Sequence, residues 1–552
     1  MESYHIVLLS VPALSHVRPL MSLATRLVLE RDDIVLTIFL SADTLDKGVA
    51  DVQYLYDQPA LANAAKRMRQ AHPLNIHINN LLTAHRHPPR ILATFVPAST
   101  DTLLTSMAKS GETYTSYYTQ LTAGQPVTCA STGTVFPGVP PPAAVIMDFI
   151  AVREVQATRA VSGASVPIIA MNFTPAAPFI RLFGPEGMGG LGDLGARVDG
   201  EVERTGRDAA EVGAEIYYRA VGEVLNIPGL PAMYDYEAFP QQTAKGPMAM
   251  FLRAGYASIM QSDGLILTSC KAYETSGSLD ALKAYRAETN KPTFALGPLV
   301  PVHYTTGNTA IDSRGGDPED ALKAFLNDKL AKFGENSVLF MSFGTMNWPE
   351  SLDNVEEVLG CLIEREVPFI FSYPAPAARL PEALIAKVNA SGLGYLSKWV
   401  PQHYVLTHPA TGWFLTHCGW GGVVEALGAG VPMICWPFSG DQPFNAAHLS
   451  ENLNVGIELI EVRTGECGAS TSVDGITSSK PLHRNGRAAQ GTRAAVRAEF
   501  LGVVDTVVRG ERGVEMRKNV ERVRREFEEA WKEGGDAREE VRAFLREFVV
   551  KE

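Results

Sequence analysis

Apolar runs and amphipathic segments follow one another in the same order near the start of the chain and again in its second half. Apolar runs at 5–12 and 34–41 enclose a segment at 18–31 with helical periodicity, which predicts a strand, a helix and a second strand. Later, the apolar runs 263–270 (DGLILTSC) and 337–349 (SVLFMSFGTMNWP) read as strands that end in turns. Strands that alternate with helices predict parallel sheets. At 552 residues, the chain is too long for one core, so we predict an α/β fold with two doubly wound domains.

The most informative stretch lies between residues 399 and 442. Its run TGWFLT at 411–416 is short, aromatic-rich and bounded by Pro409 and Gly419, so we expect a buried strand there. A glycine-rich turn (HCGWGG) follows, then a short helix that ends at Gly430 and a further strand, VPMICWPF. A strand, a glycine turn and a helix N-terminus together can bind an anion, because unpaired amide groups and the helix dipole point at the same place.

This stretch also carries polar and aromatic residues that an ordinary buried βαβ unit would not need. His417 precedes the turn and can donate to a phosphate, and Glu425 on the helix can accept from ribose hydroxyl groups. Asp441 and Gln442 form a carboxylate–amide pair suited to adjacent sugar hydroxyls, and Trp399 offers an aromatic face for a base.

The stretch resembles the signature of the plant-type UDP-glycosyltransferases, which opens on W-x-P-Q, carries HCGW and closes on D-Q. The chain departs from it at Gly421 and Gly422, where the family usually has Asn-Ser, so backbone amides would have to replace two side-chain donors. The resemblance implies a GT-B fold, two Rossmann-like domains facing across a cleft. It also implies these donor-binding residues: Thr174, Ser342, Gly344, Thr345, Trp399, Val400, Gln402, His417, Gly419, Trp420, Gly421, Gly422, Glu425, Asp441 and Gln442.

Two residues of the first half are candidates for catalysis. His16 lies in the turn VPALSHVRPL, at the edge of an open sheet where ligands bind, and the turn resembles the family's P-x-x-x-H-x-x-P segment with its catalytic base. Asp148 ends the apolar strand AAVIMDFI, where a buried carboxylate needs a partner. It would either cap a helix at 151–162 or, as the resemblance implies, orient His16 and stabilise its imidazolium; the two roles are compatible.

Two more turns match the family. FTPAAP would bring Thr174 to the donor sugar, and SFGT would bring Ser342, Gly344 and Thr345 to the diphosphate. In addition, Gln442 resembles the residue of the glucose-preferring members. The resemblance therefore implies inverting, metal-independent transfer of glucose from UDP-glucose to a hydroxyl of a small lipophilic acceptor, phenolic, terpenoid or similar, giving a β-glucoside. No cofactor is expected.

Alternatives remain at this point. The enzyme could use another UDP-sugar or a sterol or lipid acceptor, or the chain could bind UDP-sugars without catalysis. A third alternative, a nicotinamide or flavin oxidoreductase, is suggested only by overlapping G-x-G-x-x-G patterns at 187–195. Pro185 and Glu186 stand before these glycines, where the dinucleotide-binding fingerprint needs a strand. The histidines in the Pro-rich region 72–87 are spaced too loosely to favour a metal site; we expect a loop that lines the acceptor pocket. These are His72, His77, His85 and His87.

Composition narrows the partners. A net charge of −12 argues against nucleic acid and anionic membranes as partners. The resemblance implies a UDP-sugar and a small lipophilic acceptor instead, and we expect a monomer. Six cysteines without a C-x-x-C pair indicate reduced thiols. No apolar run is long enough to cross a bilayer, and the first residues lack the pattern of a signal peptide, so we expect a cytoplasmic protein.

The predicted organisation has an acceptor-binding domain at 1–298, a linker at 299–318 and a UDP-sugar-binding domain at 319–530. A last helix, within 531–552, is expected to pack back on the first domain, as the resemblance implies. Residues 462–492 are rich in Gly, Ser, Thr and Arg and lack hydrophobic periodicity, which predicts a disordered surface insertion.

Overall fold

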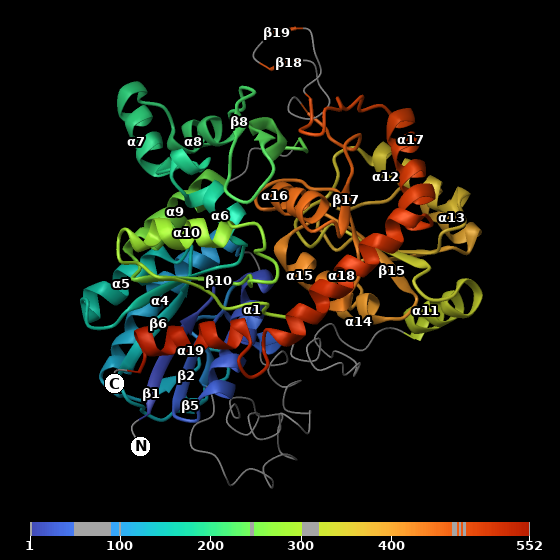
Figure 1. Cartoon of the computed structure of the whole chain (residues 1–552). Coiled ribbons are helices and arrows are strands. Elements are labelled where there is room, and N and C mark those ends of the chain that lie inside the picture. The colour runs from blue at the N-terminus through green and yellow to red at the C-terminus, as the bar shows by residue number, and fades with distance from the viewer. Residues whose placement is uncertain are drawn as a thin grey trace.

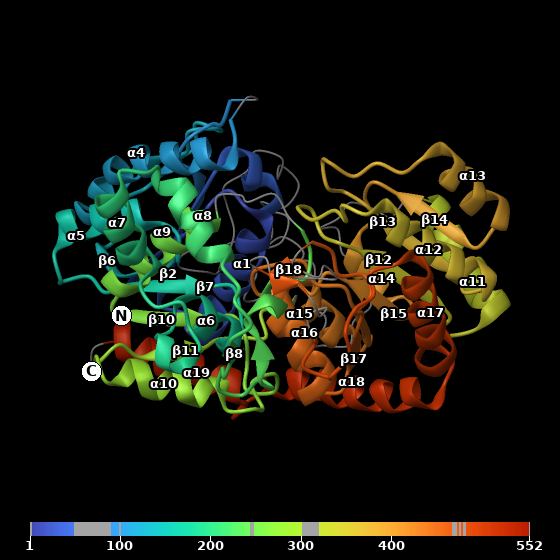
Figure 2. The ribbon, with the colours of Figure 1, turned by 90° about the horizontal axis from the view of Figure 1, so that it is seen from above.

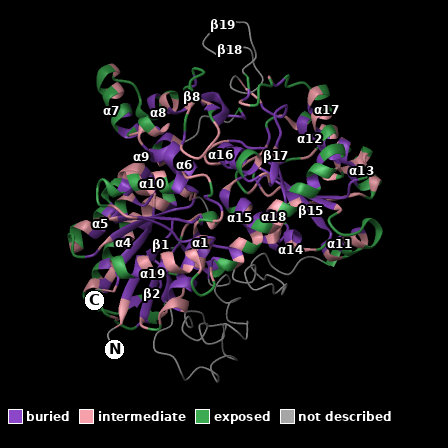
Figure 3. Cartoon of the chain, viewed as in Figure 1, coloured by how far each residue is buried: buried purple, intermediate pink, exposed green. Residues whose placement is uncertain are grey.

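The computed structural model describes residues 3–48, 90–98, 101–242, 248–300, 320–465, 472–473, 476–477 and 482–550. Two parallel sheets lie side by side, each with helices around it (Figures 1 and 2). Buried residues gather along both sheets (Figure 3). The histidines at 72–87 and most of the predicted linker at 299–318 lie outside the described residues.

The first sheet has seven parallel strands: β1 (Tyr4–Leu9), β2 (Ile34–Leu40), β3 (Arg90–Ala93), β6 (Pro142–Asp148), β7 (Ile168–Asn172), β10 (Gly264–Leu267) and β11 (Thr293–Ala295). Its helices are α1 (Leu14–Glu30), α4 (Leu103–Thr122), α5 (Val152–Ser162), α6 (Ala176–Phe183), α7 (Leu194–Thr205), α8 (Ala209–Tyr218), α9 (Met248–Gln261) and α10 (Ser278–Ala287). The strand order is β11-β10-β7-β6-β1-β2-β3. The strands that follow β1 are first added on one side of it (β2 and β3) and then on the other side (β6 and later). Open α/β sheets bind ligands at such a switch point, here between β1 and β6.

The second sheet has six parallel strands: β12 (Val338–Ser342), β13 (Phe369–Ser372), β14 (Gly394–Ser397), β15 (Thr411–Thr416), β16 (Met433–Cys435) and β17 (Gly456–Glu458). Its helices are α11 (Asp320–Phe333), α12 (Leu352–Glu364), α13 (Glu382–Ser391), α14 (Gln402–Thr407), α15 (Trp420–Ala429), α16 (Gln442–Ala447), α17 (Arg493–Val503) and α18 (Glu511–Glu529). The order is β14-β13-β12-β15-β16-β17, with its own switch point between β12 and β15. The predicted pair of doubly wound parallel sheets is confirmed.

One boundary near the predicted base is earlier than expected. The helix predicted to begin at 18 begins at Leu14, so His16 lies in the first turn of α1 and not in a loop. The amides of His16 and Val17 both donate to the carbonyl of Ala13, which starts the helix. Pro19 lies inside the helix, which continues through it.

The last helix, α19 (Asp536–Phe548), returns to the first domain, as the red end of the chain in Figure 1 shows. Its side chains Val541, Phe544 and Leu545 are buried in the same hydrophobic cluster as β1 and β2. On its outer side, Arg538 and Arg542 pair with Glu30 at the end of α1. The first domain is thus completed by residues that follow the whole second domain in sequence.

The two domains also meet through a set of buried side chains. The ring of Tyr273 lies 4.7 Å from the ring of Trp420, measured between centroids, and its hydroxyl donates to Asn445. Phe444 and Ala447 of α16 share a hydrophobic cluster with helices of the first domain. The helix that follows the D-Q end of the signature is therefore part of the interdomain contact.

The prediction of a disordered insertion at 462–492 is wrong at both of its ends. Val462, Arg463 and His483 are buried, and the side chain of Arg484 is only 4% exposed. The residues between these two ends are largely outside the described part of the chain. A sequence window without apolar periodicity suggested disorder. The ends are held by charged groups, and that kind of packing leaves no periodic signal.

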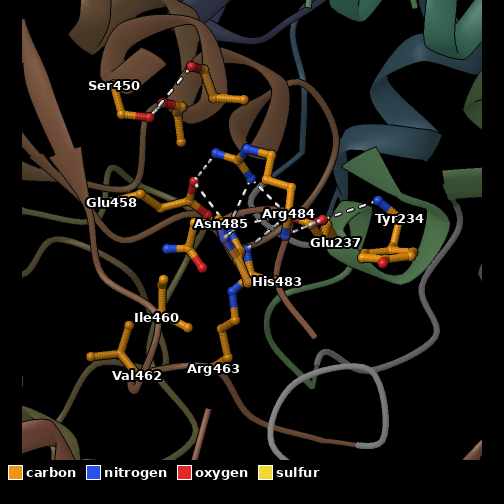
Figure 4. Close-up of polar contacts among 12 residues, drawn as sticks. Tyr234, Glu237, Ser450, Glu458, Ile460, Val462, Arg463, His483, Arg484 and Asn485 are labelled. Carbon is orange, nitrogen blue, oxygen red and sulfur yellow. Dashed lines mark hydrogen bonds and ion pairs between the residues drawn. The ribbon is translucent and has the colours of Figure 1, made fainter. Parts of the chain in front are cut away.

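Figure 4 shows how Arg484 joins the two domains. Its guanidinium donates to Glu237 of η3 (Asp235–Ala238) in the first domain at 2.7 Å and to Glu458 of the second at 2.5 Å. Arg463 donates to Glu458 as well, at 2.7 Å. Burial alone would raise the pKa of Glu458, but Arg484 and then His483 and Arg463 hold that pKa well below its usual range.

Five of the six cysteines lie in the described residues, and all five are buried free thiols. Among the helices that the structure describes, none is both long and apolar enough to cross a membrane. The cytoplasmic location and the monomeric state stay predictions.

Replacing Arg484 with Met should destabilise the fold by up to about 3–5 kcal/mol, because the buried Glu237 and Glu458 would each lose their nearest cation and keep only the groups of Arg463 and His483.

Arg522→Met is the control, since both side chains of its ion pair with Glu526 are exposed (48% and 40%), and it should cost at most about 1 kcal/mol. Chemical unfolding of both variants gives the comparison. An equal loss of stability in both variants would mean that the ion pairs of Arg484 are not buried as described.

Candidate active site

A histidine and a carboxylate meet at the switch point of the first sheet. His16, in the first turn of α1, and Asp148, the last residue of β6, come together with Nδ1 and Oδ2 2.7 Å apart. Asp148 is fully buried and also accepts from the amides of Val11 and Ile150. It is not the cap of α5, which begins at Val152 after Ala151 and has no side-chain cap.

This contact determines which nitrogen of His16 can act as a base. The hydrogen bond to the carboxylate places the ring proton on Nδ1, so Nε2 of the neutral imidazole carries the free lone pair. The His16 side chain is 20% exposed, whereas that of Asp148 is 0% exposed. His16 is therefore reachable from solvent, whereas Asp148 is not.

The turn after β7 lies beside this pair. The Oδ1 atom of Asn172 accepts from the amide of Thr174 at 3.0 Å and from its hydroxyl at 2.6 Å. The ring of Phe173 stacks on His16 with 4.3 Å between ring centroids. Because the hydroxyl proton of Thr174 is used by Asn172, its oxygen is left to accept a hydrogen bond.

The sequence predicted a site role for Thr174 but not for its neighbours Asn172 and Phe173. Asn172 is completely buried. The available signal was its place at the end of a buried strand, next to the matched Thr174.

In the second domain, two turns meet around His417. Ser342 ends β12 and its hydroxyl accepts from the amide of Gly344 at 3.3 Å, while Thr345 is exposed. A Cβ atom added to Gly344 would lie 2.8 Å from His417 Cε1, and one added to Gly419 would lie 2.6 Å from His417 Nε2. Only glycine at both positions lets the turns after β12 and β15 close on the ring.

The electrostatics of these turns suit an anion. Burial lowers the pKa of His417 to about 4, so at neutral pH the ring is an uncharged hydrogen-bonding group. Gly419 precedes α15 and has no side chain to cap it, and Asp441 binds only the amide of the first helical residue, Trp420. The amides of Gly421 and Gly422 belong to its first turn, where no earlier helical carbonyl can accept from them. They and the helix dipole favour a phosphate at this end.

The closing D-Q pair is held by its own hydrogen bonds. Asp441 accepts from the amide of Trp420 at 3.0 Å and from Asn445 Nδ2 at 2.8 Å. The Oε1 atom of Gln442 accepts from the amides of Phe438 and Ser439. Burial raises the pKa of Asp441 to about 6. Both side chains are therefore oriented before any ligand binds.

The first residues of the signature, from Trp399 on, differ in how far their side chains are exposed. Trp399 is 44% exposed, and Gln402 donates to Glu425 at 2.8 Å, which joins two of the predicted donor-binding residues. Val400 and Trp420, however, are buried, and Trp420 packs on the first domain. Only the backbone of these two residues could contact a donor, and their role in donor binding stays a prediction. Among the described residues, no group of three or more His, Cys, Asp and Glu side chains could hold a metal ion.

The glycine run at 187–195 does not form a dinucleotide-binding turn. It follows α6, passes through a 3₁₀ turn at Glu186–Met188 and enters α7, whose cap is Asp193. The fingerprint needs a strand before the glycines, so this segment gives no support to the oxidoreductase alternative.

Comparisons with known proteins agree with this geometry. Residues 298–466 match the family model described as "UDP-glucoronosyl and UDP-glucosyl transferase". UDP-glycosyltransferase eriJ of Hericium erinaceus is 29% identical over 100% of this chain and 99% of its own length. Among solved structures, Medicago truncatula UGT71G1 complexed with UDP-glucose has a TM-score of 0.65 at 17% identity, covering 99% of this chain and 98% of its own. A UGT transferase of Siraitia grosvenorii in complex with UDP has a TM-score of 0.64 at 16% identity, covering 99% and 100%.

Two doubly wound parallel sheets, with a last helix that crosses back to the first, form the GT-B architecture of glycosyltransferases. The matched family model and the full-length relative are more specific: both support a UDP-glycosyltransferase that acts on small molecules.

Replacing Gly419 with Ala should displace His417 and lower the free energy of unfolding by about 1–3 kcal/mol, since the new methyl group has no room. Gly421→Ala is the control, because a Cβ there meets no atom within 4 Å and alanine favours the helix; its stability should be unchanged or slightly higher. Thermal unfolding of the two variants is the measurement. A stable Gly419→Ala protein would contradict the close contact.

Proposed function

We propose that the protein is an inverting glucosyltransferase that moves glucose from UDP-glucose to a hydroxyl of a small lipophilic acceptor, without a metal ion. The single observation that carries the proposal is the 2.7 Å contact between His16 and the buried Asp148 at the switch point of the first sheet. A neutral imidazole tethered to a carboxylate is the arrangement that general-base catalysis needs.

In the proposed reaction, Nε2 of His16 takes the proton of the acceptor hydroxyl while its oxygen bonds to the anomeric carbon. The bond from that carbon to UDP breaks on the opposite face, and UDP leaves with the electron pair, so the configuration inverts. Asp148 stabilises the imidazolium that forms. The charge that develops on UDP is stabilised by Thr345, His417 and the first amides of α15.

The donor would lie along the second domain, with uracil on the exposed face of Trp399 and near Gln402, and with ribose at Glu425. Thr174, Asp441 and Gln442 would contact the sugar, and the orientation of these side chains by their neighbours supports that role. The preference for glucose rests on Gln442. A lipophilic acceptor is supported by two phenylalanine rings beside His16, those of Phe149 and Phe173.

The direct test is UDP release from UDP-glucose with a panel of phenolic and aliphatic alcohols, with and without EDTA. Acceptor-dependent release that EDTA leaves unchanged would support the proposal, and loss of release with EDTA would overturn its metal-free part. Competition by UDP-N-acetylglucosamine or UDP-glucuronate would reveal another donor. UDP binding without release from any acceptor would indicate a relative that only binds.

His16→Ala should lower turnover by a factor of about 100 or more, because the acceptor would lose its general base. UDP affinity should stay within about twofold, since His16 belongs to the other domain. Turnover and calorimetric UDP binding are measured on the same preparation. A variant with the parent's turnover would remove His16 from the mechanism.

The double change Gly421→Asn with Gly422→Ser should tighten UDP binding by about tenfold, because it adds two donors near the phosphates. The structure leaves room for both side chains: a Cβ at Gly421 meets nothing within 4 Å, and one at Gly422 meets only Phe414, Thr416 and Gln402 at 3.5–3.9 Å.

Alanine at both positions is the control for the change in helix propensity, and calorimetry compares the three proteins. Unchanged affinity in the Asn-Ser variant would mean that the backbone amides already satisfy the phosphates.

A further inference from the structure

The imidazole of His16 is covered on one face by a second aromatic ring. The ring centroids of His16 and Phe173 are 4.3 Å apart and their planes differ by 29°, which is a stacked arrangement. Phe149 lies further from His16, at 5.9 Å, and is tilted. Phe173 itself is only 7% exposed, so its ring is held in place by the protein.

The position of Phe173 follows from the local fold. β7 pairs in parallel with β6, with Met171 opposite Asp148, so the residues after β7 emerge beside the carboxylate. Asn172 then clamps the turn, because its side chain accepts from both the amide and the hydroxyl of Thr174. Phe173, between these two residues, is directed at the base.

The stacked ring of Phe173 fixes the orientation of the imidazole plane, which the hydrogen bond to Asp148 does not fix. The hydrogen bond from Nδ1 to Asp148 holds one atom of the imidazole and leaves the ring free to rock about that atom. A flat neighbour restricts the plane of the ring, so that Nε2 keeps one direction. It also closes one face of His16, so a substrate can reach the ring from the other face or along the Nε2 edge.

The same contact has an electrostatic effect during transfer. The face of a phenylalanine ring carries negative charge density and attracts a cation held above it. His16 becomes a cation when it takes the acceptor proton, while Asp148 of β6 approaches it in the plane of the ring. A carboxylate at the edge and an aromatic face above stabilise the imidazolium from two directions.

We propose that Phe173 is a positioning residue for His16, holding the imidazole in its reactive orientation and stabilising the imidazolium through its aromatic face. This inference rests on the proposed function, in which Nε2 of His16 takes the acceptor proton.

The test compares Phe173→Leu, which keeps an apolar side chain but removes the aromatic face, with Phe173→Tyr, which keeps the face. The leucine variant should lose about tenfold in kcat. The acidic limb of its kcat/KM profile should move to lower pH by about half a unit, because the imidazolium is less stabilised. The tyrosine variant should keep the parent's profile, and UDP affinity should not change in either.

Phe183→Leu is the matched control. Its ring packs on Phe149 and Phe179, one layer away from the base, so a general loosening of this region would show there as well. A purely structural role for Phe173 would lower kcat without moving the acidic limb. An unmoved limb in Phe173→Leu, or the same movement in Phe183→Leu, would overturn the inference. Phe173→Met repeats the test if leucine weakens folding.

His16→Ala separates this inference from the function on which it depends. If His16→Ala keeps the parent's turnover, the proposed mechanism fails and the role of Phe173 fails with it. If His16→Ala is inactive and the acidic limb of Phe173→Leu stays in place, only the role of Phe173 is wrong.

Discussion

The ligand edge of the first domain depends on a buried carboxylate. Asp148 has no exposed surface, and a charge in that position is costly unless donors surround it. The donors come from three places: the amide of Val11 after β1, the amide of Ile150 beyond β6, and the ring of His16 on α1. The requirement to satisfy one charge therefore brings these segments into a single arrangement. The orientation of the imidazole is a by-product of a stabilising interaction.

In the second domain, the position of His417 is fixed by close packing against glycines, which have no side chain. Gly344 and Gly419 are closely packed against His417, and any larger residue at either position would collide with the ring. Between the ring and the helix, Cys418 has a φ of 65°, a backbone conformation that few residues other than glycine adopt. The turn before α15 is thus compact and constrained, which directs its amides at one place.

The sequence was informative where a pattern repeats or where residues lie close together along the chain. Parallel strands have apolar runs, so both sheets were predictable, and the ends of β1 and β6 located His16 and Asp148. The stacking of Phe173 on His16 was not predictable, because it depends on which strands are neighbours in space.

The ends of the segment 462–492 were not predictable either. They are held by Arg484 and Glu237, which lie 247 residues apart in the chain. An ion pair of that separation gives no local signal, and a window of polar residues looks the same whether its charges are solvated or paired.

The return of α19 to the first domain has a consequence for the order of folding. The strands of the first sheet end at Ala295, but Val541, Phe544 and Leu545 complete the core around β1. A ribosome delivers the chain from its N-terminus, so the first domain emerges early while part of its core is still untranslated. Until residues of α19 arrive, the surface that they cover is exposed to water and to other nascent chains. We expect this surface to be where the unfinished protein most needs a chaperone.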